Sequence, residues 1–176
     1  RARLAVDLDA TCPRLSEQGE LTLRAARHPL LALSGIEVVP NDIILGAGKG
    51  LLISGPNAGG KTVCLKTAGL CALMVRAGLL LPVAPDSCIP LYRRVLAEIG
   101  DAQSLAQNLS TFTAHLAQLL GFFQLLDDDA MRAAERWAAR KVTGEEAQRK
   151  DDCVGALVLI DEIVTGTDPR QGEALA

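Results

Sequence analysis

Short apolar runs separated by turn-forming residues dominate the first part of the chain. Strand-like runs cover Leu21–Ala26, Ile36–Val39 and Ile43–Leu45, with prolines, glycines and an Asn-Asp pair between them. A fourth run, Leu51–Ser54, leads directly into a glycine-rich turn. This pattern predicts a small, largely antiparallel sheet near the N-terminus, followed by one buried strand.

Longer patterns follow the glycine-rich turn. The stretch from Gly60 to about Ala77 has the composition of a helix that ends at the following glycine, and Phe112–Leu126 has the spacing of an amphipathic helix. Arg94–Ile99 has the pattern of a strand, and the continuous apolar run Ala156–Ile160 is typical of a strand buried on both faces. Strands that alternate with helices predict an α/β fold.

The composition adds limits to this picture. The 176 residues suffice for one domain with a substantial core, and 49% of them are hydrophobic. The net charge is -3 and the sequence shows no cluster of basic residues, so most contacts with any nucleic acid are expected outside this chain. The five cysteines form no CxxC pair, which favours free thiols in a reducing cytosol. The stretch that most resembles a membrane-spanning segment is Leu65–Leu81, and Lys66 and Arg76 interrupt it. We therefore expect a cytoplasmic protein with no membrane partner.

Three segments differ in character. Residues 1–20 are mixed, contain Pro13 and Gly19, and are expected to be the end of a preceding segment. Residues 21–176 are expected to form one domain that is incomplete at its C-terminus, because the chain stops inside a starting helix. Within this domain, the charge-rich stretch 127–152 predicts an exposed helical insertion.

The turn Gly55–Thr62 carries the most specific chemistry of the sequence. It fits the pattern G-x-x-x-x-G-K-[ST], with an apolar run before it and a helical pattern after it. Glycines let successive backbone N–H groups point at an anion, Lys61 can reach the β- and γ-phosphates of a nucleotide, and Thr62 can offer its hydroxyl to Mg²⁺. The alternative is a glycine-rich turn that binds nothing. The residues expected to contact the nucleotide here are Gly55, Pro56, Asn57, Ala58, Gly59, Gly60, Lys61, Thr62 and Val63.

A pair of acids follows the apolar run that ends at Ile160. Asp161 is expected to hold Mg²⁺, and Glu162 is expected to polarise the attacking water as general base. The alternative is a strand with a solvated acidic end. Together with the glycine-rich turn, the pair predicts an ATPase with ATP and Mg²⁺ as cofactors and with Lys61 and Glu162 as catalytic residues.

Several motifs occur together along the chain. They are Gly55-Pro-Asn-Ala-Gly-Gly-Lys-Thr62, Leu109-Ser-Thr-Phe112, Asp161-Glu-Ile-Val-Thr-Gly-Thr-Asp-Pro169, Ala26-Arg-His-Pro29, Pro40-Asn-Asp-Ile43 and Ile99-Gly-Asp-Ala-Gln-Ser104. In this combination they resemble the ATPase domain of the MutS family, within the ABC-type ATPases. The amino-acid sequence of Lys61–Leu70 resembles that of the second MutS branch, whose members bear an Smr endonuclease and suppress recombination. The resemblance covers residues 21–176 and implies a P-loop NTPase of the ABC type, with a mixed central sheet flanked by helices.

The resemblance also implies roles that the residues alone leave open. ATPase domains of this family form homodimers with two composite sites, in which Ser110 would act in trans on the γ-phosphate bound by the other subunit. The alternative for Ser110 is a plain helix cap. Val38 and Pro40 would lie against the adenine, with aliphatic contact in place of ring stacking. Thr165–Asp168 would couple the two sites, or form only a turn.

For the whole protein, the resemblance implies a DNA-binding ATPase that acts in the suppression of homologous recombination or in DNA repair. Branched DNA or recombination intermediates, and any endonuclease activity, would involve segments outside this chain. Two alternatives stay open: a nucleotide-gated quality-control factor that binds the ribosome or its RNA, and a classical sensor of mismatched DNA. The protein is accordingly expected in the cytoplasm, at the nucleoid or the ribosome. No chemical role follows for His28.

Overall fold

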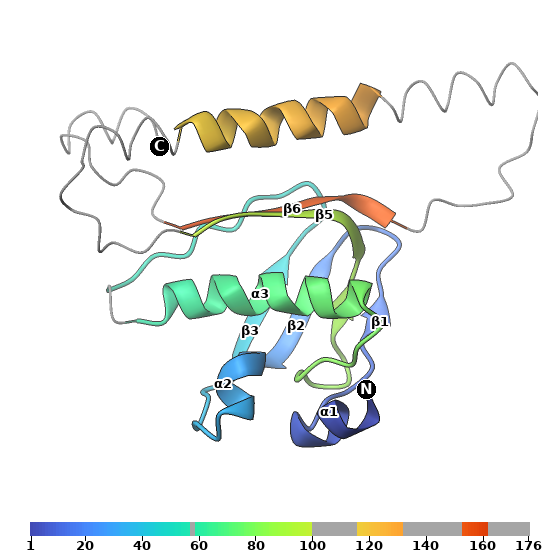
Figure 1. Ribbon diagram of the computed structural model, residues 1–176, viewed down its shortest axis with the longest axis vertical. Coiled ribbons are helices and arrows are strands. Elements are labelled where there is room, and N and C mark those ends of the chain that lie inside the picture. The colour runs from blue at the N-terminus through green and yellow to red at the C-terminus, as the bar shows by residue number, and fades with distance from the viewer. Residues whose placement is uncertain (57–58, 100–115, 132–152, 162–176) are drawn as a thin grey trace, which may run out of the picture. The chain divides into compact units, whose positions relative to one another are not determined.

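The residues that the computed structural model describes are 1–56, 59–99, 116–131 and 153–161 (Figure 1). The chain divides into two compact units, formed by residues 1–95 with 151–159 and by residues 96–150 with 160–176. Both helical and strand elements occur, so the fold is of the α/β class, as expected. Within the described ranges, no helix is long and apolar enough to cross a membrane.

A four-stranded sheet lies near the N-terminus, in the strand order β1-β4-β2-β3. Its strands are β1 (Arg14–Leu15), β2 (Leu21–Ala26), β3 (Asn41–Leu45) and β4 (Cys88–Ile89). β2 pairs antiparallel with both β3 and β4, whereas β1 pairs parallel with β4. The small, largely antiparallel sheet predicted from the sequence is therefore confirmed, with β4 contributed from much later in the chain.

Alternating burial fixes the register of β2. Leu21 and Leu23 are buried, and Thr22 between them is half-buried, as expected for a strand with one face on a core. The register with β3 shifts between Leu23 and Ala26, and Ala26 is again buried after this bulge. The bulge thus returns the end of β2 to the core side.

A short helix follows β2. α2 (Pro29–Leu33) has His28 as its N-cap and proline in its first turn. A proline breaks strands, but its fixed φ also suits the start of a helix, which explains why the sequence suggested only a turn here. The prediction of a strand at Ile36–Val39 is wrong: within the described part of the chain these residues pair with no strand and connect α2 to β3.

The prediction of a buried strand at Leu51–Ser54 is also wrong. In the part of the chain that the structure describes, these residues pair with no strand, and Leu52 is 81% exposed. A strand requires a neighbour for its N–H and C=O groups, and a short apolar run does not specify one. The apolar run therefore carried too little information to predict a strand.

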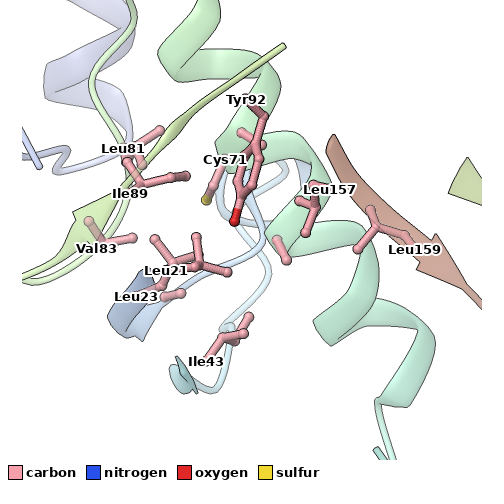
Figure 2. Packing of buried hydrophobic residues seen from close by; sticks show 13 residues of the cluster. Leu21, Leu23, Ile43, Cys71, Leu81, Val83, Ile89, Tyr92, Leu157 and Leu159 are labelled. Carbon is pink, nitrogen blue, oxygen red and sulfur yellow. The ribbon is translucent and has the colours of Figure 1, made fainter. Parts of the chain in front are cut away.

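The helix α3 (Lys61–Arg76) follows the glycine-rich turn, as predicted, and Gly78 with φ +66° comes just after its end. Its buried face consists mainly of small side chains: Thr67, Ala68, Gly69, Cys71 and Ala72. Figure 2 shows Cys71 within a hydrophobic cluster to which the small sheet also contributes Leu21, Leu23, Ile43 and Ile89. The small residues let α3 approach its neighbours closely.

Two further strands, β5 (Leu91–Glu98) and β6 (Cys153–Ile160), form a two-stranded sheet. They contain the strands predicted at 94–99 and 156–160, except for the terminal residue of the first. Leu157 and Leu159 of β6 are buried in the cluster of Figure 2, whereas Val158 is 38% exposed. The prediction that β6 is buried on both faces is therefore wrong. The reason is that a continuous apolar run does not reveal which face meets a partner.

α3 and β6 approach each other very closely at Gly69. A Cβ atom built on Gly69 would lie 2.6 Å from Cδ1 of Leu159, well inside van der Waals contact. Glycine is therefore the residue that allows this packing distance, although it is a poor helix former in a helix interior. The close contact joins the helix that begins at the glycine-rich turn to the strand that leads to Asp161.

The N-terminal segment packs against the same sheet. α1 (Ala2–Asp7) precedes Leu8, which is almost completely buried. Thr11 forms an antiparallel bridge with Leu81, and Arg27 donates a hydrogen bond to the carbonyl oxygen of Leu8 at 2.8 Å. These contacts bring residues 1–20 beside β2 and β4. A domain boundary after residue 20 stays a prediction.

The amphipathic helix predicted at 112–126 is described over residues 116–131, and it continues into the stretch predicted as an insertion. Residues 112–115 and the remainder of the insertion, 132–152, lie outside the described residues. The helical continuation beyond residue 126 agrees with the helical character expected of that stretch.

Candidate functional site

The glycine-rich turn has a backbone that only glycine adopts readily at several positions. Gly55 has φ +151° and Gly60 has φ +78°, both in the region that disfavours residues with a Cβ atom. The N–H group of Gly59 donates to the carbonyl oxygen of Pro56 at 2.9 Å. A Cβ atom on Gly59 would lie 2.9 Å from that same oxygen, which is too close. Asn57 and Ala58 lie outside the described residues.

The turn delivers the start of α3. Gly60 is the N-cap, and the first hydrogen bond within the helix runs from the N–H group of Cys64 to the carbonyl oxygen of Gly60, 2.9 Å. The backbone N–H groups of Lys61, Thr62 and Val63 precede this bond. In the first turn of a helix such groups point away from the helix along its axis and create a positive potential that suits an anion.

The side chain of Lys61 folds back over the turn. Its Nζ atom donates to the carbonyl oxygens of Gly55 at 2.8 Å and Pro56 at 3.0 Å. Among the described residues, no carboxylate forms an ion pair with Lys61. The positive charge is therefore held by neutral carbonyl groups, which a more strongly accepting phosphate oxygen can replace.

The residues of the turn fit a nucleotide phosphate. Cβ atoms built on Gly55 and Gly60 would meet no atom within 4 Å, so the backbone is open on that side. A bare backbone, a helix start and a lysine ammonium group lie within eight residues, Gly55–Thr62. This combination of donors matches the negative charge and many acceptors of a polyphosphate.

Asp161 comes directly after β6, and its backbone N–H group donates to the carbonyl oxygen of Glu98 at 2.8 Å. Glu98 is the last residue of β5. The carboxyl ends of the two paired strands therefore lie at the same edge, as in parallel strands, where polar side chains of α/β proteins gather. Among the described residues, no group of three potential metal ligands lies together.

Val38 and Pro40 lie between α2 and β3. Val38 is half-buried and Pro40 is exposed. Both α2 and β3 contact α3, so the segment that joins them belongs to the same unit as the glycine-rich turn. This placement is compatible with the base contact expected from the resemblance and does not test it.

A family model and the sequences of known proteins point to the same family. The family model of MutS domain V matches residues 51–131, which include the glycine-rich turn and α3. Endonuclease MutS2 of Carboxydothermus hydrogenoformans is 46% identical over the whole chain, and that of Thermomicrobium roseum is 42% identical. Endonuclease MutS2 of Lactiplantibacillus plantarum is 41% identical, again over 100% of this chain. The chain belongs to the MutS2 branch of the MutS family. It spans only 19–20% of the length of these relatives.

One residue of this MutS2 chain has a structural role that sequence reasoning missed. His28 is buried, and its Nδ1 atom accepts a hydrogen bond from the backbone N–H group of Leu31 at 3.4 Å. Burial, followed by the charge of Lys66, lowers the pKa of His28 below its usual 6.5. A neutral imidazole is the form that can accept this bond. The sequence signal that could have identified His28 as a helix cap was its place as a polar residue immediately before a proline and an apolar run.

A second group of missed residues holds the bulge of β2. Asp42 accepts a hydrogen bond from the N–H group of Ala25 at 2.8 Å and an ion-paired one from Arg24 at 2.7 Å. The bond from Ala25, followed by that from Arg24, lowers the pKa of Asp42. No sequence signal identifies this set, because the contact depends on how two strands align.

The remaining predicted site residues of this MutS2 chain lie outside the described residues. They are Ser110, Glu162 and the loop 165–168. Of the other predicted residues, the structure brings Gly55, Pro56, Gly59, Gly60 and Lys61 together around one turn, with Thr62 and Val63 at the helix start that follows it.

Proposed function

We propose that the chain binds Mg·ATP at the glycine-rich turn and hydrolyses it. The observation that carries this proposal is the turn itself, whose left-handed glycine backbone ends at the start of α3 with the Lys61 ammonium group held over it. Such a turn presents N–H groups and a positive charge to one bound anion. Membership of the MutS2 branch supports the proposal, because the family model of MutS domain V covers the turn and α3.

The chain's own groups divide the work in this proposal. Backbone N–H groups of the glycine-rich turn, to which Pro56 contributes none, and of the first turn of α3 hold the phosphates, and Lys61 exchanges its two carbonyl acceptors for phosphate oxygens. The hydroxyl of Thr62 and the carboxylate of Asp161 hold the metal ion. When bound, Mg·ATP supplies the transferable phosphoryl group together with the cation that offsets its charge.

Two further residues complete the proposed reaction. Glu162 takes the proton from the attacking water, since it follows the strand whose end carries Asp161. Ser110 approaches the γ-phosphate from the second subunit of a homodimer and adds hydrogen-bond donors there. The close contact of Gly69 with Leu159 packs the helix that follows the turn against the strand that precedes both acids in the sequence.

The test is steady-state phosphate release from Mg·ATP over a series of protein concentrations. Specific activity that rises with concentration supports composite dimer sites, and activity that stays flat contradicts them. Glu162→Gln is expected to abolish turnover while ATP still binds, whereas Lys61→Ala is expected to weaken ATP binding itself. Retention of turnover in Glu162→Gln would rule out this residue as the base.

For the whole protein, we propose that the ATPase cycle drives a DNA-binding MutS2 protein in the suppression of recombination or in DNA repair. The relatives are named Endonuclease MutS2, and the nuclease of such a protein would lie outside this chain. The chain's net charge of -3 supports a nucleic-acid contact made by other segments. A pulldown that compares binding of branched DNA and of ribosomal RNA by the full-length protein separates the two functions. Preferred binding of branched DNA supports this proposal, and preferred binding of ribosomal RNA supports ribosome quality control.

A further inference from the structure

The bulge of β2 is fixed by side chains on both sides. On the β4 side, the backbone N–H group of Arg24 donates to the Oγ atom of Ser87 at 3.0 Å. On the β3 side, the next N–H group along the chain, that of Ala25, donates to Oδ1 of Asp42 at 2.8 Å. Two consecutive backbone donors that the shifted register would leave unpaired are therefore satisfied by side chains.

Ala25 is held in an unfavourable conformation. Its φ is +46°, in the left-handed region where a Cβ atom clashes with the following carbonyl group. Such a conformation persists only where surrounding contacts impose it. Asp42 supplies that constraint, because one carboxylate oxygen takes the Ala25 N–H group and the other takes the Arg24 guanidinium at 2.7 Å. The bulge and the carboxylate thus depend on each other.

Asp42 also fixes one end of the segment that contains Val38 and Pro40. It is the second residue of β3, directly after that segment. At the other end of the segment, α2 is capped by His28 and contacts α3. The segment between these two anchors has no strand or helix of its own, so its path is determined by where its ends are held.

We propose that Asp42, paired with Arg24, is a positioning residue for the nucleobase. It holds the end of the segment 38–40 in the place where Val38 and Pro40 contact the base, and it does not touch the nucleotide itself. This inference rests on the proposed function and on the adenine contact that the family resemblance implies for those two residues. Aliphatic contact depends strongly on distance, because dispersion falls steeply when a gap opens. Loss of the carboxylate therefore weakens the base contact.

The phosphate contact has its own support and serves as an internal reference. The turn Gly55–Thr62 is shaped by glycines and by the carbonyl contacts of Lys61, none of which involves Asp42. A ligand that carries phosphates but no base should therefore be insensitive to the β2 bulge. Inorganic tripolyphosphate with Mg²⁺ is such a ligand.

The experiment measures equilibrium binding of ATP and of tripolyphosphate to the full-length protein by calorimetry. For Asp42→Ala, we expect the Kd of ATP to rise about fivefold and that of tripolyphosphate to change by less than about twofold. Asp7→Ala removes an equally exposed charge from a loose 3.9 Å pair on α1 and is expected to change neither value. An equal rise for both ligands, or no rise for ATP, overturns the inference.

A second variant separates positioning from general loss of structure. Glycine adopts φ +46° without a clash, so Ala25→Gly is expected to restore the bulge when Asp42 is absent. The double variant Ala25→Gly, Asp42→Ala should bind ATP within about twofold of the wild type. A double variant that stays as weak as Asp42→Ala overturns the inference. Failure of the wild type to bind either ligand would instead overturn the proposed function.

Discussion

The contact between Gly69 and Leu159 allows a sharp test of how α3 packs. Replacing Gly69 with alanine adds one methyl group, whose carbon would lie 2.6 Å from Cδ1 of Leu159. Both residues belong to the same compact unit, and Leu159 is only 8% exposed. Its methyl group lies within the buried cluster, so the Leu159 side chain, the helix or the strand has to shift.

Two opposing terms decide the result. Alanine in place of a glycine inside a helix stabilises by about 1 kcal/mol, mainly because the unfolded chain loses less freedom on folding. Overpacking a tight contact costs about 1–3 kcal/mol. With about 2 kcal/mol for the clash, Gly69→Ala is expected to lower the free energy of unfolding by about 1 kcal/mol. The sign is therefore opposite to that of helix propensity alone.

Urea unfolding of the single and double variants separates the two terms. Leu159→Val removes the Cδ1 methyl group, so Gly69→Ala in that background should stabilise by about 1 kcal/mol. The two substitutions are then coupled by about 2 kcal/mol. Gly121→Ala, in the helix of residues 116–131, is the matched control because its Cβ atom would meet nothing within 4 Å.

Two outcomes would refute this reasoning. One is that Gly69→Ala stabilises the otherwise wild-type chain as much as Gly121→Ala does. The other is that the effects of Gly69→Ala and Leu159→Val simply add. Unchanged urea m-values across the set are required for the comparison, since a changed m-value reports a different unfolded or native state.

Three further predictions follow from other parts of the chain. His28 has a lowered pKa, so the unfolded state binds its proton more readily; the contribution of His28 to the free energy of unfolding should be complete above pH 6.5 and fall below it, and urea titrations of His28→Asn, which keeps an acceptor, should show a smaller fall than the wild type. Gly59→Ala places a methyl group 2.9 Å from the Pro56 carbonyl oxygen, so calorimetry should show the Kd of ATP rising about tenfold or more, whereas unchanged affinity would contradict the turn geometry. Burial raises the pKa of the Cys71 thiol to about 12, so at pH 8 a thiol reagent should modify exposed Cys12 rapidly and Cys71 only after unfolding; equal rates would show that the core is open.

Features that depend on one continuous stretch of chain were predicted correctly from the sequence, whereas features that depend on distant partners were not. α3 was predictable because its composition, the turn before it and Gly78 after it all lie within one stretch of chain. The same holds for the glycine-rich turn, where Gly55 and Gly60 have the positive φ that glycine allows. The predictions for Leu51–Ser54 and for the two-sided burial of β6 failed because both depended on strand or helix partners that a local pattern does not name.

The bulge in β2 shows the same limit within the candidate site. Ala25 has φ +46° and donates its N–H group to Asp42 of β3, whereas Ser87, just before β4, accepts from the N–H group of the preceding residue, Arg24. Alanine itself gives no signal of a left-handed backbone, and Arg24 resembles any surface arginine. Only the register of β2 with β3 reveals why an aspartate follows Pro40-Asn41.

The small residues on the buried face of α3 have a mechanical consequence. No side chain of α3 separates the backbone of Gly69 from the Leu159 side chain, whose Cδ1 atom is the atom nearest to a Cβ built on Gly69. Closely packed atoms transmit strain because they have little room to yield. A displacement of α3, such as a bound anion at its first turn would cause, would therefore press the helix backbone directly on a side chain of β6.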